Sequence, residues 1–188
     1  AHAGPTPMAL RRDALQVATK LMQEVVACAH RHPPHGRGTV GMVNVFPNSR
    51  NVIPGRVKFS IDLRNASDAL CDAMDADIRA VAAKLSAETG LPIEITQVSA
   101  YPAQPFHPDL IAAVQRGADT LGYSNMPCVS GAGHDAVYMA RLAPAGMIFI
   151  PCKDGISHNE IEDAKPEHIT AGCNVLLHAM LERAGVAS

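Results

Sequence analysis

The spacing of apolar residues along the first hundred positions predicts helices and strands in a definite order. Residues 10–29 place apolar side chains every three or four positions, as one buried stripe on a helix requires. Residues 39–46 (TVGMVNVF) are rich in branched side chains and predict a strand. Residues 56–64 (RVKFSIDLR) alternate apolar and polar positions strictly, which predicts a second strand with one dry face. Ser67 then caps a predicted helix that ends at Gly90.

A further strand is predicted at residues 93–98 (IEITQV), so the order is helix, strand, strand, helix, strand. This is the ferredoxin-like β-α-β-β-α-β order without its first strand, which would lie upstream of Ala1. Three prolines in AYPAQPFHPDL at residues 100–110 indicate a boundary. We therefore expect one domain at residues 1–102 and a second at 103–188.

The second domain is expected to be α/β in character. Its pattern predicts a helix at about 108–121, a short helix through Arg141, a buried strand at 146–151 (GMIFIP) and a last helix from Pro166. The apolar stripe expected on that last helix consists of Ile169, Cys173, Leu176, Leu177 and Met180. A single strand cannot support a parallel sheet, so this half resembles the end of a larger α/β domain. The expected fold class is thus α+β followed by α/β.

Composition narrows the class of protein. Apolar residues make up 47% of the chain and charged residues 18%, with a formal net charge of −2, as in soluble globular proteins. This balance argues against nucleic acid and against an anionic membrane as partners. The five cysteines are odd in number and widely spaced, which favours reduced thiols and a cytoplasmic location. We see no apolar run long enough to span a membrane and no signal peptide pattern.

Two glycine-rich segments carry histidines that suit chemistry. His158 in GISHNE follows the predicted buried strand, where open α/β sheets bind ligands, and is a candidate metal ligand. In SGAGHDA, the backbone at Gly131 and Gly133 could bind an anionic group while His134 polarises a carbonyl. The alternatives are a turn-capping histidine and an ordinary glycine turn. No nearby motif completes a metal site around His158.

Arg64 and Asn51 are candidates for binding a carboxylate. A guanidinium group matches a carboxylate with two hydrogen bonds, and an asparagine amide adds another contact. Arg64 lies on the polar face of its predicted strand, and Asn51 lies in the connection before that strand. The alternative is a solvated sheet face on which Arg64 pairs with Asp62.

Four ordered motifs together resemble the bacterial N-carbamoyl-L-amino acid amidohydrolases and the related β-ureidopropionases and allantoate amidohydrolases, which are aminoacylase-like two-metal hydrolases. The motifs are AHAGPTPMALRRDAL, NVFPNSRNVIPGRVKFSIDLRN, VSGAGHDAVYMARLAP and MIFIPCKDGISHNEIED. The resemblance implies a ferredoxin-like lid and dimerisation domain inserted into a catalytic domain that binds two divalent ions, Zn or Mn, Ni or Co. It also implies a homodimer, which we expect to form through the outer strand at residues 39–46.

The resemblance also implies roles for individual residues. His158 matches a metal ligand, and His2 in AHAG matches a lid histidine that stabilises the oxyanion. His134 matches a second histidine near the carbamoyl group. Asn51 and Arg64 match the residues that hold the substrate carboxylate, with backbone groups around Gly131 and Gly133 assisting.

The other metal ligands and the general base of the family have no counterpart here, so the chain resembles the C-terminal portion of such an enzyme. We expect this chain alone to be inactive and to bind divalent metal weakly or not at all. The implied reaction converts N-carbamoyl-L-amino acids, or N-carbamoyl-β-alanine, to amino acid, carbon dioxide and ammonia. Two alternatives remain: an allantoate amidohydrolase, and a non-catalytic dimerisation or substrate-binding fragment.

Overall fold

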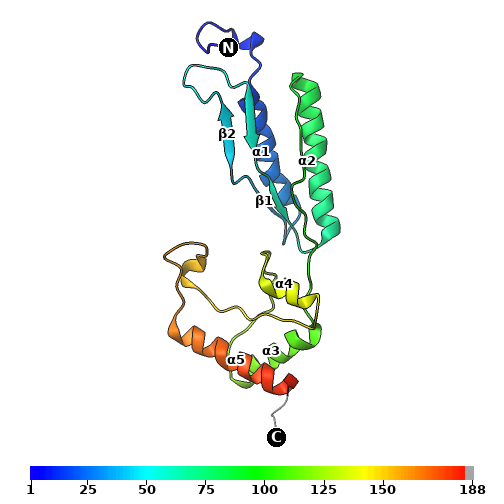
Figure 1. Cartoon of the computed structure of the whole chain (residues 1–188), viewed down its shortest axis with the longest axis vertical. Helices are drawn as coiled ribbons and strands as arrows, with labels where there is room; N and C mark the ends of the chain where they lie inside the picture. Colours follow the sequence, from blue (N-terminus) through cyan, green and yellow to red (C-terminus); the bar gives the residue numbers. More distant parts are fainter. Residues whose placement is uncertain (185–188) are drawn as a thin grey trace. The chain divides into compact units, whose positions relative to one another are not determined.

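The computed structural model describes residues 1–184 and divides into two compact units, Ala1–Ala103 and a second that begins at Gln104. Helices dominate both units, and the first also contains short paired strands (Figure 1). The division falls in the proline-rich segment that the sequence pattern marked. No helix within residues 1–184 is both long and apolar enough to cross a membrane.

The first long helix, α1 (Ala14–Arg31), begins four residues later than the apolar spacing predicts. Asp13 is its N-cap: one carboxylate oxygen accepts hydrogen bonds from the backbone of Leu15 and Gln16, at 3.0 and 3.3 Å. The preceding residues form a separate 3-10 turn, η1 (Met8–Leu10), in which Leu10 is 73% exposed. The cap, rather than the apolar period, fixes the start of the helix.

Four short strands form a bent antiparallel ribbon where two longer strands were expected. β1 (Arg37–Thr39) pairs with β4 (Asp62–Arg64), and β2 (Val43–Phe46) pairs with β3 (Arg56–Phe59). Between the two pairs, Ser60 donates its backbone N–H to the carbonyl of Met42 at 3.0 Å, and its hydroxyl accepts from the Met42 N–H at 3.1 Å. Residues 40–42 there lie opposite only residues 60–61, which is the arrangement of a β-bulge.

The second long helix, α2 (Asp68–Thr89), begins and ends as predicted. The Ser67 hydroxyl accepts a hydrogen bond from the Leu70 N–H at 3.4 Å, and Gly90 ends the helix with a φ of 64°. Helices α1 and α2 pack side by side against the ribbon (Figure 1). The largest fully buried side chains of this core are Leu21, Val25, Cys28, Met74 and Ile78.

Gly38 lets the ribbon approach helix α1 closely. A Cβ atom at this position would lie 2.4 Å from the backbone oxygen of Val25, a distance that no side chain tolerates. Glycine is therefore required on β1 where the strand crosses the helix.

The strand expected at residues 93–98 is absent. Ile93 and Ile95 alternate with exposed residues and pack against the core, but the segment forms no ladder with any described strand. Its contact with α2 is a hydrogen bond from the Arg79 guanidinium to the Ile95 carbonyl, at 3.2 Å. Alternation decides which side chains turn inward, whereas a strand also needs a neighbouring backbone.

Residues 104–184 of the second unit contain four helical segments. They are α3 (Pro108–Thr120), α4 (Asp135–Ala140), the 3-10 turn η2 (Lys153–Gly155) and α5 (Pro166–Ala184). Helix α3 packs on α5, and at Gly117 the two helices approach so closely that a Cβ atom would lie 3.1 Å from the Cβ of His178.

Two expectations for the second unit are wrong for this chain. Residues 146–151 are neither a strand nor buried, and Phe149 is 51% exposed. On α5 the buried residues are Val175 and Ala179, whereas the residues of the predicted apolar stripe are partly or largely exposed. The apolar stripe therefore has no covering layer among the described residues.

Candidate functional site

The segment around His2 is held against the loop that carries Asn51. His2 forms an isolated antiparallel bridge with Val52, in which the Ala3 N–H donates to the Asn51 carbonyl and the Ile53 N–H donates to the Ala1 carbonyl, both at 2.8 Å. Two candidates that are 49 positions apart in the sequence are thus brought into neighbouring positions. Both residues are exposed.

The His2 imidazole has a defined hydrogen-bonding role. Its Nδ1 accepts the backbone N–H of Gly4 at 3.0 Å, so in the neutral ring the proton resides on Nε2. The Nε2–H group is then a donor of the kind that an oxyanion requires.

Arg11 stabilises the turn that follows His2. Its guanidinium donates to the carbonyls of Ala3 at 2.6 Å and Thr6 at 3.1 Å, while the Thr6 hydroxyl donates to the His2 carbonyl at 2.6 Å. The side chain of Arg11 is partly buried and bridges this turn to the start of α1. The sequence analysis gave Arg11 no role, although it lies within the first of the four motifs.

Arg64 lies on β4 and forms a two-point pair with Asp62. The Nε–Oδ1 and Nη2–Oδ2 distances are both 2.8 Å, and each side chain is about half exposed, at 49%. Hydrogen bonding from Arg64 lowers the pKa of the Asp62 carboxyl, against the opposing effect of burial. This is the pairing that the sequence analysis kept as the alternative to substrate binding, and it shows that the guanidinium is presented in a geometry that binds a carboxylate.

Asn51 and Arg64 lie at opposite ends of the bent ribbon. Asn51 is in the loop that joins Phe46 to Arg56, whereas Arg64 pairs with Arg37 at the far end. The eight steps from Arg56 to Arg64 span at most about 25 Å at the rise of an extended strand. One copy of the chain therefore cannot bring both side chains to the same small carboxylate.

In the second unit, His134 is held by two neighbours at the start of α4. Its Nε2 lies 2.5 Å from the Ser130 hydroxyl, and its ring meets Phe149 edge to face at a centroid distance of 5.5 Å. The Ser130 hydroxyl also accepts the N–H of Ala132 at 3.2 Å. His134 is the N-cap residue of a helix of only six residues, and its side chain makes no capping hydrogen bond.

The glycines of this loop leave space above its backbone. Gly131 has a φ of 70°, and a Cβ atom at Gly131 or Gly133 would have nothing within 4 Å. The loop is therefore open enough for a ligand atom to approach the backbone closely.

His158 lies in an exposed turn with a φ of 56°, and its backbone N–H donates to the Glu162 carboxylate at 3.0 Å. Within residues 1–184, no group of three potential metal-ligating side chains includes His158. The described residues therefore do not fit a two-metal centre by themselves. His2, Asn51 and Arg64 belong to the first unit, and His134, Gly131, Gly133 and His158 belong to the second.

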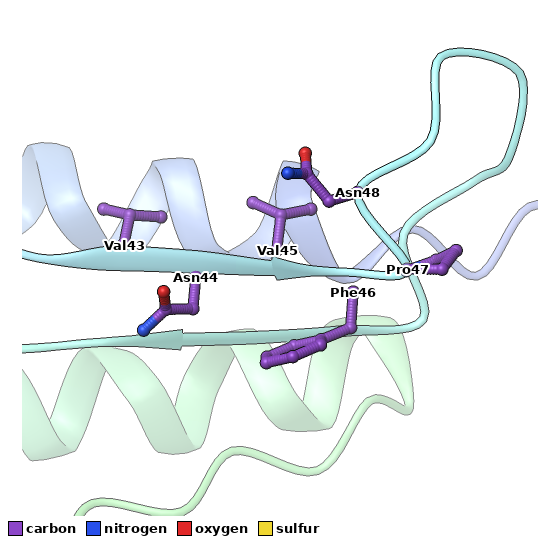
Figure 2. Close-up of a pocket in the computed structure, with 6 residues that line it drawn as sticks. All are labelled: Val43, Asn44, Val45, Phe46, Pro47 and Asn48. Atoms are coloured by element: carbon purple, nitrogen blue, oxygen red, sulfur yellow. The ribbon is translucent and has the colours of Figure 1, made fainter.

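A hollow of about 390 Å³ lies along the outer edge of β2. It is lined by residues 43–48, and Figure 2 shows Val43 and Val45 on one side of the strand and Asn44 and Phe46 on the other. The Arg56 guanidinium stacks on the Phe46 ring at 4.1 Å. Val43 and Phe46 are 44% and 39% exposed, so this edge presents apolar surface as well as backbone groups.

Comparison with known proteins agrees with the motif resemblance. The sequence profile of Peptidase family M20/M25/M40 matches residues 9–182. The N-carbamoyl-L-amino-acid amidohydrolase of Rhizobium meliloti is 42% identical over 186 residues, covering 99% of this chain and 45% of that protein. The allantoate amidohydrolase of Bacillus subtilis is 33% identical over 175 residues, covering 93% of this chain and 42% of that protein.

The structure is similar to a solved amidase of the hydantoinase/carbamoylase family from Burkholderia multivorans. The TM-score is 0.95 at 52% identity, and the match covers 100% of this chain and 46% of that one. The chain thus spans about half the length of the relatives it matches. On the profile match and the shared structure, this chain belongs to Peptidase family M20/M25/M40 and is a relative of its carbamoylase and allantoate amidohydrolase members.

Proposed function

We propose that this chain is part of a metal-dependent amidohydrolase that cleaves the carbamoyl C–N bond of N-carbamoyl-L-amino acids. The observation that carries the proposal is the bridge between the His2 segment and the Asn51 loop. It presents an imidazole donor and an amide from two distant motifs on one surface. In this view the first unit is a ferredoxin-like lid and dimerisation domain, and the second is the C-terminal segment of the catalytic domain.

The side chains suit distinct parts of such a substrate. The Nε2–H of His2 donates a hydrogen bond to the carbamoyl oxygen as negative charge develops there. Arg64 binds the carboxylate end with its planar guanidinium, and the Asn51 amide adds a further contact. His134, whose Nε2 lies beside the Ser130 hydroxyl, and the backbone at Gly131 and Gly133 are the contacts to substrate that the second unit would contribute.

Two divalent ions would supply the activated water in the complete enzyme, and His158 is the ligand that this chain contributes. The described residues do not complete that centre, so the remaining ligands and the general base would come from outside this chain. The identity of the ions, zinc or manganese, nickel or cobalt, belongs to that complete site.

Substrate binding by both Asn51 and Arg64 calls for two copies of the chain. These residues lie at opposite ends of the ribbon, so a shared carboxylate would meet Asn51 from one copy and Arg64 from the other. The apolar outer edge of β2 is the surface that we propose pairs in the homodimer, since an unpaired strand edge binds another strand readily (Figure 2).

The cysteines agree with a cytoplasmic location, which we propose together with the function. All five are free thiols, and Cys28 is fully buried in the core. Neither the charge balance nor the described surface suggests a nucleic acid or membrane partner.

Allantoate is the second candidate substrate. A relative that is 33% identical over 93% of this chain carries that name, and allantoate also presents a carboxylate and carbamoyl nitrogen. The motifs named above would serve either substrate, so the choice depends on the shape of the complete pocket.

The test uses a hybrid protein, in which the residues that precede the matching region in the Rhizobium meliloti relative are fused to the N-terminus of this chain. Ammonia release is measured with divalent metal present. Faster turnover of N-carbamoyl-L-amino acids than of allantoate supports the proposal, and the reverse order favours the second candidate. Absence of turnover on both substrates, in a folded and metal-loaded protein, would favour a non-catalytic dimerisation or substrate-binding role.

A further inference from the structure

Three side chains from two helices converge at one place in the first unit. The sulfur of Cys28 lies 4.0 Å from Nδ1 of His32 and 4.0 Å from Oδ2 of Asp77. One candidate ligand atom from each of the three residues lies within 4.8 Å of the other two. None of the three belongs to the motifs that carry the proposed activity.

The fold explains why they meet. Cys28 and His32 are four residues apart, and His32 is the C-cap of α1, so both lie on one face at the end of that helix. Asp77 lies on α2, which packs beside α1. Cys28 is fully buried, His32 is partly buried, and the Asp77 side chain is 48% exposed. The group therefore runs from the core to solvent.

We propose that Cys28, His32 and Asp77 form a binding site for a single thiophilic divalent cation, with zinc as the best match. Thiolate, imidazole and carboxylate are the three ligand types of zinc sites, and three protein ligands leave one position for water. Zinc bonds of about 2.0–2.3 Å place tetrahedral ligands about 3.3–3.8 Å apart, so a contraction of up to about 1.5 Å closes the site. The cation joins α1 to α2.

Binding requires defined changes at the ligands. The Cys28 thiol leaves the Met74 carbonyl, 3.7 Å away, and gives up its proton to solvent to form the thiolate; burial raises the pKa of this thiol in the metal-free protein. His32 Nδ1 carries a proton that it donates to the Cys28 carbonyl at 2.9 Å, so the ring takes the Nε2–H tautomer and releases that hydrogen bond when Nδ1 binds the ion. His32 and Asp77 move aside to admit the ion and then close on it.

The positive charge of Arg31 disfavours binding of a cation at this site. Its guanidinium lies 3.7 Å from Oδ2 of Asp77 and 2.5 Å from Oε1 of Glu24. Binding breaks the longer contact and leaves Arg31 paired with Glu24. Removing the Arg31 charge should therefore strengthen the site.

The experiment titrates the 188-residue chain with cobalt(II) and then with zinc(II), following absorption. Binding through Cys28 should produce a thiolate-to-cobalt charge-transfer band that saturates at one cobalt per chain and disappears as zinc displaces cobalt. Cys28→Ser, His32→Ala and Asp77→Asn should each weaken binding about tenfold or more, and Arg31→Gln should tighten it. Zinc should also raise the melting temperature of the wild-type chain.

Cys71→Ser is the matched control, because Cys71 is a second free thiol in the first unit, partly buried, and its sulfur lies 3.7 Å from the Leu63 carbonyl. His158→Ala controls for the proposed ligand of the catalytic centre. Both variants should bind cobalt like the wild type, so this result is independent of the proposed function. If Cys28→Ser fails to fold, the two variants at the more exposed ligands decide the question. A charge-transfer band that survives Asp77→Asn and His32→Ala, or its absence from the wild type, overturns the proposal.

Discussion

Arg64 donates two hydrogen bonds to the carboxylate of Asp62, its neighbour two residues away on β4, with both N–O distances at 2.8 Å. The guanidinium plane is thereby fixed, and its geometry is the one in which arginine binds a carboxylate side by side. A lysine has the same charge but cannot reproduce two parallel hydrogen bonds.

We therefore expect Arg64→Lys to lower kcat/KM for N-carbamoyl-L-amino acids in the chain extended with the upstream residues of its relative. The loss should be about 1.5–3 kcal/mol, or about 10- to 150-fold, the range for hydrogen bonds to charged groups. Steady-state kinetics measures it. Arg37→Lys is the control, since Arg37 lies opposite Arg64 on the ribbon and its guanidinium donates to the carbonyls of Pro34 and Gly36. Equal kinetics for Arg64→Lys and wild type would remove Arg64 from substrate binding.

The Asp62–Arg64 pair should contribute a pH-dependent increment of stability. Hydrogen bonding from Arg64 lowers the pKa of Asp62 in the folded chain, so the increment is complete above the carboxyl pKa of the unfolded chain, about 4, and is lost as pH falls through the folded pKa. Because both side chains are half exposed, we expect at most about 1 kcal/mol.

Urea unfolding of the wild type and Asp62→Asn at several pH values measures this increment. The difference in unfolding free energy should be constant near neutral pH, shrink below pH 4 or so, and decrease at high salt. A difference that persists unchanged in acid contradicts the assignment to the ion pair.

Arg11 should control the mobility of the His2 segment. Its hydrogen bonds to the carbonyls of Ala3 and Thr6 hold the turn that pairs with the Asn51 loop. In Arg11→Gln we expect faster hydrogen exchange at the amides of Ala3 and Ile53, which form the bridge, and a loss of global stability of only about 1 kcal/mol. Arg12→Gln, which removes a hydrogen bond to the Gly90 carbonyl instead, should leave these two amides unchanged. Unchanged exchange in Arg11→Gln would show that the bridge holds without the guanidinium.

Helix α5 offers a direct comparison between its buried and exposed apolar residues. Val175 is 5% exposed and packs towards α3, whereas Leu177 is 54% exposed. In the 188-residue chain, Val175→Ala should lower the unfolding free energy by about 1–3 kcal/mol, and Leu177→Ala should change it by no more than about 0.5 kcal/mol.

In the chain extended with the upstream half of its relative, we expect Leu177→Ala to become destabilising as well, because a covering layer would bury it. Denaturant unfolding of both variants in both proteins makes the comparison. Equal, small effects of Leu177→Ala in the two proteins would mean that this face stays exposed.

The sequence determined the local features of this protein. Caps and breakers act over a few residues, so Ser67, Gly90 and Pro108 placed the ends of their helices correctly. Motif order also identified the family, which the profile match confirms. The predicted start of α1 was wrong because the apolar spacing extends upstream of Asp13, the residue that caps the helix.

The tertiary structure decided every feature that depends on contact between distant segments of the chain. Residues 93–98 and 146–151 have strand-like composition but form no ladder with another strand within residues 1–184, and the predicted apolar stripe on α5 is exposed. The pairing of His2 with the Asn51 loop and the convergence of Cys28, His32 and Asp77 depend on contacts across many residues. For the group of Cys28, His32 and Asp77, the only local indication in the sequence is that Cys28 and His32 are four residues apart, at the end of one helix. Hydrogen-bonded ladders and ligand clusters need atoms from distant parts of a chain, and local propensity does not encode which distant parts will meet.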